Sequence, residues 1–297
     1  MNRRNSEYIL RSNPRSLFPL VDDKVMTKQL AIKHGIPTPE LFHVVEQHGD
    51  IRYFDERMGG RDEFVVKPAR GSGGSGILLI MSRSREGFIN QNGQVISMAD
   101  FHYHLSGILS GIHSLEGLED KAVVEALVHA DPVFSGVTWH GVPDVRLIVY
   151  RGVPVMGMLR LPTRASDGKA NIHRGAIGVG IRISDGETLF AVHNTKLIDI
   201  HPDTGRSVCG LRVPHWDVIL RMSARTFEMT GLGYLGADWV LDHTRGPLLL
   251  ELNARPGLVI QLANQAGLRT RLEAVDHAPC AMFSSPETRV TWAKQQF

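Results

Sequence analysis

Cysteine is scarce in this chain of 297 residues, and so are long apolar stretches and any excess of one charge. The two cysteines, Cys209 and Cys280, have no metal-ligand spacing and belong to no cysteine-rich framework. This excludes a disulfide-stapled small scaffold and a cysteine-based zinc site, and it favours free thiols in a reducing compartment. We therefore predict a cytoplasmic protein.

Charge is nearly balanced, with 33 lysines and arginines against 31 acids and a formal net charge of +2. Neither a basic tail nor a charge block is present, so the chain is not expected to bind nucleic acid or a membrane surface. No apolar stretch approaches the length of a membrane span, and the segment Met1–Arg15 lacks the apolar core of a secretory signal. Hydrophobic residues make up 42% and charged residues 22%, which is typical of one large or two ordinary globular domains.

Polar residues interrupt an apolar run in the segment LLLELNARPG, which spans residues 248–257. Because side chains alternate along a strand, Glu251 and Asn253 are expected to share one face. Residues 236–242 form a second predicted strand, and a hairpin turn signal, HTRG, joins the two. Antiparallel pairing would bring Asp238 across from Glu251. The three oxygen ligands would suit a hard cation such as Mg²⁺, with Mn²⁺ as a substitute. The alternative is an edge strand whose polar residues face water.

Helical and strand signals alternate irregularly along the chain, with hairpins among them, which favours an α+β fold over a regular parallel sheet. The first 21 residues look irregular. Helices are predicted at Lys24–His34, within 98–118, at 214–230 and at 258–266. Strands are predicted at 64–67, 77–81, 123–128, 145–150 and 153–161, besides the hairpin already described. Residues 162–180, rich in glycine, arginine and lysine, are expected to form a long functional loop.

A glycine-rich segment, ARGSGGSG at residues 69–76, follows the predicted strand that ends at Lys67. Glycines allow backbone amides to approach phosphate oxygens closely, and successive N–H groups in such a turn form an anion nest. A lysine beside it would neutralise the same phosphates. The pattern is neither a Walker motif nor a dinucleotide fingerprint, because a strand rather than a helix follows. The alternative is a plain flexible hairpin.

Taken in order, Lys67 with its glycine loop, Glu125, Asp238, Glu251 and Asn253 resemble the pattern of the ATP-grasp superfamily. The chain is most similar to the RimK-type glutamate ligases, in particular to an α-L-glutamate ligase-like subfamily. The resemblance extends from about Lys24 to Gly267, and its most specific pieces are 65–67 with 71–76, 171–175 and 251–257. It implies the ATP-grasp fold, in which two mainly antiparallel sheets with helices grip the nucleotide between them.

The resemblance assigns the nucleotide contacts. The positions implied to bind phosphate are Lys24, Lys67, Gly73, Gly74, Ser75 and Gly76. Glu125, with backbone groups of Ala126 and Leu127, would read the adenine edge, and Asp144 would accept hydrogen bonds from the ribose. Asn171 matches a family position near the nucleotide and the metals. The alternatives are that Glu125 is a strand acid facing water and Asp144 an ordinary turn residue.

The resemblance also implies catalytic roles for cationic residues. Arg146 and Arg160 lie in adjacent apolar strands, where an arginine is either a surface ion-pair member or a phosphate clamp. Arg146 would contact the phosphates, and Arg160 would stabilise an acylphosphate or a tetrahedral oxyanion. Lys169 stands where relatives often carry arginine and would assist them. Arg255 would bind the carboxylate of an acidic substrate, or else brace its turn through backbone carbonyls.

Two features depart from the family pattern. Only residues 1–23, expected to be irregular, precede the ATP-grasp region at 24–297, too few for the usual substrate-binding domain. A partner protein or a second subunit would then supply that domain. A small nucleotide-covering subdomain is expected at about 60–128, with a helical insertion near 90–118 that acts as a lid or an oligomer contact. A larger catalytic and metal-binding subdomain would occupy about 129–297. The insertion carries histidines with poor ligand spacing, interpreted as structural or surface residues: His102, His104 and His113.

These expectations combine into one leading hypothesis, an ATP- and Mg²⁺-dependent carboxylate–amine ligase that forms a peptide or isopeptide bond through an acylphosphate. The substrates would be small-molecule or peptide acids and amines, with glutamate or another amino acid as one of them. Two alternatives stay open: an ATP-grasp small-molecule kinase, and a nucleotide-binding regulatory protein with degraded catalysis. No Ser/His/Asp or Cys/His arrangement in the sequence indicates covalent catalysis by the protein itself.

Overall fold

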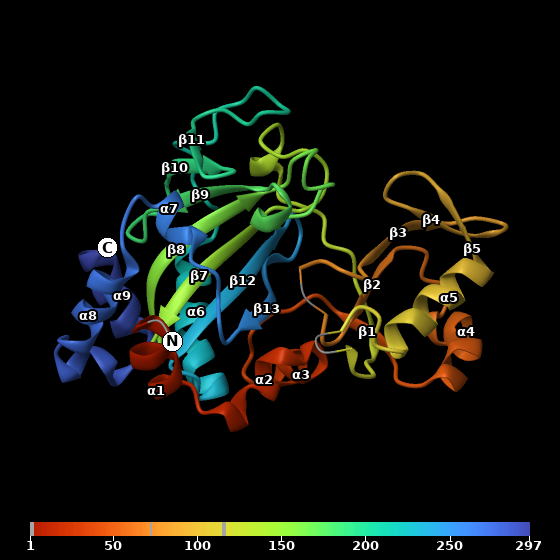
Figure 1. The fold of residues 1–297 in the computed structure, drawn as a ribbon, viewed down its shortest axis with the longest axis horizontal. Coiled ribbons are helices and arrows are strands. Elements are labelled where there is room, and N and C mark those ends of the chain that lie inside the picture. Colours follow the sequence, from red (N-terminus) through yellow and green to blue (C-terminus); the bar gives the residue numbers. More distant parts are fainter. Residues whose placement is uncertain (1–2, 72, 115–116) are drawn as a thin grey trace. The chain divides into compact units, whose positions relative to one another are not determined.

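The computed structural model describes residues 3–71, 73–114 and 117–297, which form two compact units with one antiparallel sheet each (Figure 1). The large unit comprises Met1–Val21, Gln29–Thr38 and Val128–Phe297, and the small unit comprises Asp22–Lys28 and Pro39–Leu127. The prediction of an α+β fold with two mainly antiparallel sheets is confirmed. Among the described residues, no helix combines the length and the apolar character that a membrane crossing requires.

The small unit is built on a six-stranded sheet in the order β1-β6-β2-β3-β4-β5. Its strands are β1 (Leu41–Val45), β2 (Phe64–Pro68), β3 (Leu78–Arg83), β4 (Gly87–Asn90), β5 (Val95–Ser97) and β6 (Ala122–Glu125). Its helical segments are η3 (His48–Tyr53), α4 (Phe54–Met58) and α5 (Met98–Leu109). The expected helical insertion near 90–118 is therefore partly strand, because β4 and β5 pair as a hairpin before α5 begins. The small unit also takes in residues 22–28 and 39–59, which lie outside the predicted bounds of 60–128.

Four phenylalanines form the centre of the small unit's core: Phe54, Phe64, Phe88 and Phe101. The rings of Phe54 and Phe101 pack edge to face with centroids 4.8 Å apart, and those of Phe64 and Phe88 do so at 5.2 Å. Such aromatic pairs bury a large apolar area. They hold α4 and α5 against β2 and β4, so the strand that carries Lys67 rests on a rigid base.

The helix α3 (Lys24–Lys33) begins where the sequence predicts. The Oδ1 atom of Asp23 accepts hydrogen bonds from the backbone N–H groups of Val25 at 2.9 Å and Met26 at 3.2 Å, which makes Asp23 the N-cap. Gly35, with φ of +64°, lies just beyond the helix in the left-handed conformation that glycine tolerates best.

The large unit is built on a seven-stranded sheet in the order β11-β10-β9-β8-β7-β12-β13. Its strands are β7 (Asp144–Tyr150), β8 (Val153–Leu161), β9 (Ile177–Ile181), β10 (Thr188–His193), β11 (Lys196–Ile198), β12 (Tyr234–Asp242) and β13 (Gly246–Asn253). Its later helical segments are η5 (Pro132–Phe134), η6 (Ile172–Arg174), α6 (Trp216–Thr230), α7 (Val259–Ala263), α8 (Leu268–Asp276), η7 (Cys280–Ser284) and α9 (Pro286–Gln296). The loop expected at 162–180 is shorter, because its last residues form β9.

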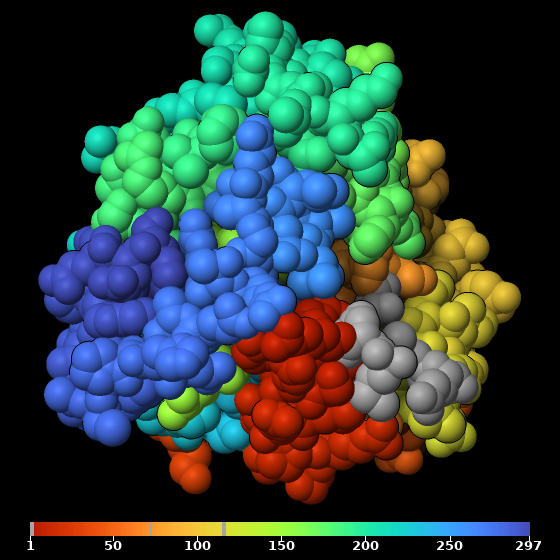
Figure 2. Space-filling model, turned by 60° about the vertical axis from the view of Figure 1, so that its left-hand side comes forward, coloured from red at the N-terminus to blue at the C-terminus, as the bar shows by residue number. Residues whose placement is uncertain are grey.

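The N-terminal segment, expected to be irregular, is mostly helical. It contains η1 (Arg4–Ile9), α1 (Leu10–Ser12), η2 (Arg15–Leu17) and α2 (Pro19–Asp22). The rings of Tyr8 and Tyr150 pack edge to face, and the buried side-chain amide of Asn13 donates to the carbonyl oxygens of Tyr234 and Ala254 at 2.7 and 3.1 Å. These tertiary contacts explain the order of the segment, which packs beside C-terminal elements of the large unit (Figure 2). No local sequence pattern predicts these contacts.

Helices α6 and α7 pack on opposite faces of the large sheet. A Cβ placed on Gly157 of β8 would lie 3.3 Å from the ring of Trp216, at the start of α6. A Cβ placed on Gly180 of β9 would lie 2.3 Å from the carbonyl oxygen of Ala263 in α7. Gly180 pairs with Met158, the neighbour of Gly157 along β8, and successive strand residues point to opposite faces.

Replacing Gly180 with alanine should destabilise the large unit by about 1–3 kcal/mol, because the new methyl group would overlap backbone atoms of α7 that cannot rotate away. The measurement is urea unfolding of Gly180→Ala beside Gly257→Ala, since a Cβ at Gly257 would have no atom within 4 Å among the described residues beyond its chain neighbours. The control variant should stay within about 0.5 kcal/mol of the parent. Equal stabilities of the two variants would contradict the close packing of α7.

Candidate active site

Six polar side chains share one face of the adjacent strands β8, β7, β12 and β13. The register places Asp144 opposite Arg160, Arg146 opposite Asp238, and Asp238 opposite Glu251. The predicted pairing of Asp238 with Glu251 is therefore observed. We call this group the sheet-face cluster; its members are Asp144, Arg146, Arg160, Asp238, Glu251 and Asn253.

Asp238 is the centre of the sheet-face cluster. Arg146 donates to it through Nε at 2.6 Å and through Nη2 at 2.5 Å, in a two-pronged contact. Arg160 donates to it through Nη2 at 2.7 Å and grips Asp144 with both Nε and Nη2. Such bidentate pairs fix the orientation of both partners. When all three carboxylates are ionised, they outnumber the two guanidinium groups by one negative charge, which favours the binding of a cation.

Burial sets the protonation of the two inner acids, since Asp238 is fully buried and Asp144 is 5% exposed. Burial raises the pKa of Asp144 to about 7, with Arg160 opposing the shift and the charge of Asp238 adding to it. Burial also acts to raise the pKa of Asp238, but Arg146 and Arg160 outweigh it and hold that pKa well below its usual range. Asp238 therefore stays ionised at neutral pH and keeps its oxygens as acceptors.

Two carboxylates and one amide of the cluster fit a hard cation. The Nδ2 atom of Asn253 lies 3.5 Å from Oδ2 of Asp238 and 3.4 Å from Oε1 of Glu251, so the three side chains converge. A half-turn of this amide would present its oxygen instead. Within the described ranges, no group of three or more His, Cys, Asp or Glu side chains is arranged to hold a metal. Carboxylate and amide oxygens are donors that Mg²⁺ accepts, and this ion completes its shell with water and phosphate oxygens.

In the small unit, the side-chain ammonium group of Lys67 belongs to a buried cluster of charged groups. Its Nζ pairs with Oε1 of Glu125, and Nζ of Lys28 lies 2.8 Å from Oε2 of the same carboxylate. All three side chains are at most 5% exposed. Burial acts to raise the pKa of Glu125, but the two lysines outweigh it and lower that pKa. This Lys–Glu–Lys triad, formed by Lys28, Lys67 and Glu125, carries one net positive charge, which suits the binding of an anion.

The glycine loop is held by side chains from other segments of the small unit. Nζ of Lys24 donates to the carbonyl oxygen of Gly71 at 2.7 Å, which brings this predicted phosphate ligand to the loop. Oγ of Ser75 lies 3.1 Å from Nδ1 of His113, and Nε2 of His104 lies 3.1 Å from the carbonyl oxygen of Gly76. Gly73, Gly74 and Gly76 all have positive φ. A Cβ on Gly76 would meet the ring of His113 at 2.6 Å, so only glycine fits there. Ser72 lies outside the described residues.

The other predicted residues belong neither to the sheet-face cluster nor to the Lys–Glu–Lys triad or the glycine loop. The N–H of Ala126 donates to the carbonyl oxygen of Glu40 at 2.9 Å, and buried Leu127 follows it after the end of β6. Oδ1 of Asn171 accepts from the N–H of His173 at 3.0 Å and caps η6. Nζ of Lys169 lies 3.3 Å from Oδ2 of Asp167. The guanidinium of exposed Arg255 lies 5.1 Å from the ring centre of Phe18. The roles assigned to these residues stay predictions.

Three residues that contact the candidate site were missed by sequence reasoning. Lys28 was not singled out, although it follows Lys24 by one helical turn and so shares its side of α3. His104 and His113 were interpreted as structural or surface residues, yet both contact the glycine loop. Burial lowers the pKa of His104, which favours its neutral form. Nothing in their local sequence indicates these contacts, because the loop precedes them by 28 to 38 positions.

Comparison with protein families gives one match that spans most of the chain. The family is described as sugar-transfer associated ATP-grasp, and its profile matches residues 3–277. Curated relatives include a probable α-L-glutamate ligase of Aeromonas salmonicida, 24% identical over 241 residues, and one of Klebsiella pneumoniae, 24% identical over 236 residues. Each alignment covers 80% of this chain, but only 57% and 56% of the relative. The chain thus spans less than three-fifths of the length of these relatives.

Solved structures share the fold at low sequence identity. A pyruvate carboxylase from Rhizobium etli aligns with 92% of this chain and 19% of its own, with a TM-score of 0.52 and 15% identity. At this identity the likeness concerns the fold alone.

Proposed function

The chain belongs to the sugar-transfer associated ATP-grasp family, as its resemblance to ATP-grasp proteins predicts, and on this premise we propose that it is an ATP-dependent carboxylate–amine ligase. The reaction would release ADP and phosphate and form a peptide or isopeptide bond. The observation that carries the proposal is the sheet-face cluster, in which two partly buried arginines and a candidate donor set for a cation share one face of the sheet. The names of the curated relatives support glutamate as one substrate.

In such a ligation, the substrate carboxylate attacks the γ-phosphorus of ATP, and the amine then displaces phosphate from the acylphosphate. Both steps build negative charge on oxygen atoms. We assign Arg146 to the phosphates and Arg160 to the acylphosphate or tetrahedral oxyanion, because both are already oriented by carboxylates. Asp238, Glu251 and Asn253 would hold Mg²⁺, which neutralises phosphate charge when bound. Lys169 and Arg255 are assigned supporting contacts to the substrates.

The nucleotide contacts proposed for the small unit follow its charge. Lys67 and Lys24 would neutralise the phosphates beside the glycine loop, since the Lys–Glu–Lys triad is net positive. Glu125 and the backbone of the segment that follows it would read the adenine. Because the N–H of Ala126 already donates to Glu40, other backbone groups of Ala126 and Leu127 would make that contact. Asp144 would bind the ribose in competition with Arg160.

The acid and amine substrates are the remaining part of the proposed reaction. The chain spans less than three-fifths of the length of these relatives, and we propose small-molecule or peptide acids and amines as its substrates. The identity of the amine substrate is not fixed by these observations. Because the family is described as sugar-transfer associated, amino sugars should be tested beside amino acids and short peptides.

Purified protein with Mg²⁺ and ATP should release phosphate only when an acid and an amine are supplied together. The measurement is a phosphate-release screen of paired acids and amines, with glutamate in every row and amino sugars among the amines. Nucleotide products are identified in parallel. AMP with pyrophosphate would contradict the proposed reaction. Phosphate retained on a single substrate would identify a kinase instead.

A further inference from the structure

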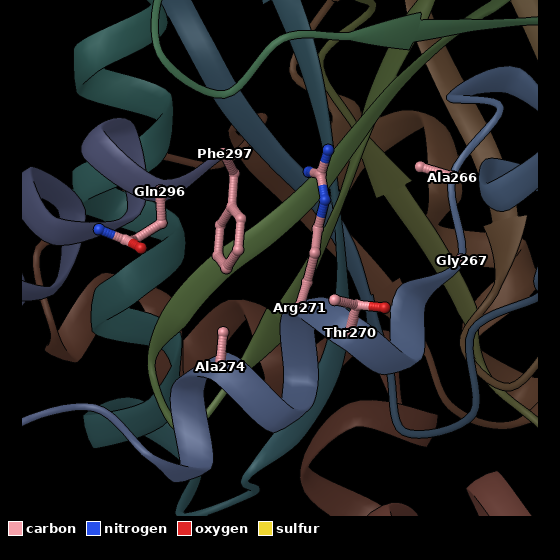
Figure 3. A pocket seen from close by; sticks show the side chains of 7 residues that line it. All are labelled: Ala266, Gly267, Thr270, Arg271, Ala274, Gln296 and Phe297. Carbon is pink, nitrogen blue, oxygen red and sulfur yellow. The ribbon is translucent and has the colours of Figure 1, made fainter.

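A cavity of about 490 Å³ opens in the large unit between α8 and the end of α9 (Figure 3). This volume lies within the range of small-molecule sites. The residues that line it are mostly small or apolar, with one cation, and include Ala266, Thr270, Arg271, Ala274, Gln296 and Phe297. Figure 3 shows the Arg271 side chain rising from α8 beside the ring of Phe297.

Arg271 is a cation that the fold partly shields from water. Its Nη1 donates to the carbonyl oxygen of Val155 at 2.7 Å, and its guanidinium lies 5.1 Å from the ring centre of Phe297. Burial lowers its pKa, and no acidic group opposes that shift. The acids of the same helix are otherwise engaged, since Glu273 pairs with Arg269 and Asp276 accepts from Tyr150. A partly buried guanidinium that pairs with no carboxylate side chain of the described residues favours an anionic ligand.

The guanidinium atoms of Arg271 that make no hydrogen bond within the described residues indicate which shape of anion would fit. Arg146 and Arg160 each use their Nε and Nη2 atoms to grip a carboxylate with two parallel hydrogen bonds. Arg271 bonds Val155 through Nη1, and across the described part of the chain its Nε and Nη2 atoms have no acceptor. We propose that this cavity binds a small organic monocarboxylate, whose carboxylate takes the Nε and Nη2 fork of Arg271 and whose apolar body packs beside Phe297 and Ala274.

The charge and lining favour a monocarboxylate over inorganic phosphate. One guanidinium neutralises one carboxylate, whereas a phosphate dianion would leave a negative charge in a cavity where, among the described residues, Arg271 is the one lining side chain that carries a charge. Ala266, Ala274 and the Phe297 ring offer apolar surface that phosphate cannot use. Thr270 and Gln296 add neutral polar groups at the cavity wall.

This site is separate from the sheet-face cluster. Val155, which anchors Arg271, precedes Arg160 by five positions on β8, a separation of about 16 Å along a strand. The inference therefore does not depend on ATP chemistry, and its test contains no nucleotide.

Benzoate should bind the protein saturably in isothermal titration calorimetry up to about 20 mM, and should raise its melting temperature. Benzamide, the neutral analogue, and inorganic phosphate should bind at least about 10-fold more weakly. Arg271→Gln should weaken benzoate binding by about 10-fold or more, because it removes the charge-assisted contact. Ala274→Leu should do the same by filling the cavity while it keeps the arginine.

The control is Arg269→Gln, on the same helix, where the side chain is 60% exposed and pairs with Glu273 outside the cavity. Its benzoate affinity should match that of the parent. The proposal is overturned if the parent protein shows no saturable benzoate binding, or if Arg271→Gln and Ala274→Leu both bind benzoate as the parent does. Arg271-dependent binding of phosphate as tight as that of benzoate would overturn the monocarboxylate assignment.

Discussion

Replacing Glu251 with alanine should lower Mg²⁺- and ATP-dependent phosphate release by about 1000-fold while the fold stays intact. Loss of a metal ligand removes several kcal/mol of charge stabilisation from the reacting phosphates, and about 4 kcal/mol corresponds to that factor. The stability change should stay within about 1 kcal/mol, because the Glu251 side chain is 31% exposed and its oxygen lies 4.0 Å from Nη2 of Arg146. Turnover and urea unfolding are measured on the same preparation.

Glu251 is a cleaner test than Asp238. Asp238 is fully buried and accepts hydrogen bonds from both Arg146 and Arg160, so its loss would leave two guanidinium groups without their partner. The control is Glu273→Ala, an acid on the surface of α8 that should keep full turnover. Parent-level phosphate release by Glu251→Ala, over the whole range of Mg²⁺ concentration, would refute the metal assignment.

Replacing Glu125 with glutamine should destabilise the small unit by about 3–5 kcal/mol. The variant keeps the side-chain volume but removes the carboxylate that pairs with the buried ammonium groups of both Lys28 and Lys67. Breaking a buried ion cluster by removing one partner leaves uncompensated charges in a medium of low dielectric. The measurement is urea unfolding followed by a probe confined to the small unit.

Glu46→Gln is the matched control for Glu125→Gln. Glu46 also pairs with a lysine of the small unit, Lys121, but the two side chains are 59% and 42% exposed. That loss should cost about 0.2–1 kcal/mol. Because the pKa of Glu125 is lowered in the folded protein, its stabilisation is present above the unfolded pKa of about 4.3 and is lost as pH falls further. The difference between parent and Glu125→Gln should therefore shrink in acid. Equal losses for both variants at neutral pH would contradict the burial of the triad.

Local patterns predicted those parts of the site that adjoin along the chain. Strand alternation and a hairpin turn were enough to place Asp238 opposite Glu251, and the register confirms that pairing. Other predicted elements were of the right type with shifted ends. The helix expected at 258–266 is shorter in the structure, where α7 covers Val259–Ala263. Helix ends depend on tertiary contacts as well as on capping residues.

Pairings between distant segments were not predictable from such patterns. Arg146 and Asp238 are 92 positions apart, and no local signal states that β7 and β12 are neighbours. The burial of Lys28 beside Glu125 likewise depends on where α3 meets β6. A lysine in an amphipathic helix is ordinarily exposed, so only the folded unit reveals a buried one.

The sequence by itself determined the α+β class, the Asp238–Glu251 hairpin and the resemblance to ATP-grasp proteins, because turn residues, side-chain alternation and motifs act over short stretches of chain. The tertiary structure alone decided which charges meet. It placed Arg146 and Arg160 on Asp238, buried Lys28 with Glu125, and brought Arg271 to the wall of a cavity. These contacts join segments whose proximity arises only when the sheets assemble, and the energies that hold them depend on burial, which no single segment possesses before folding.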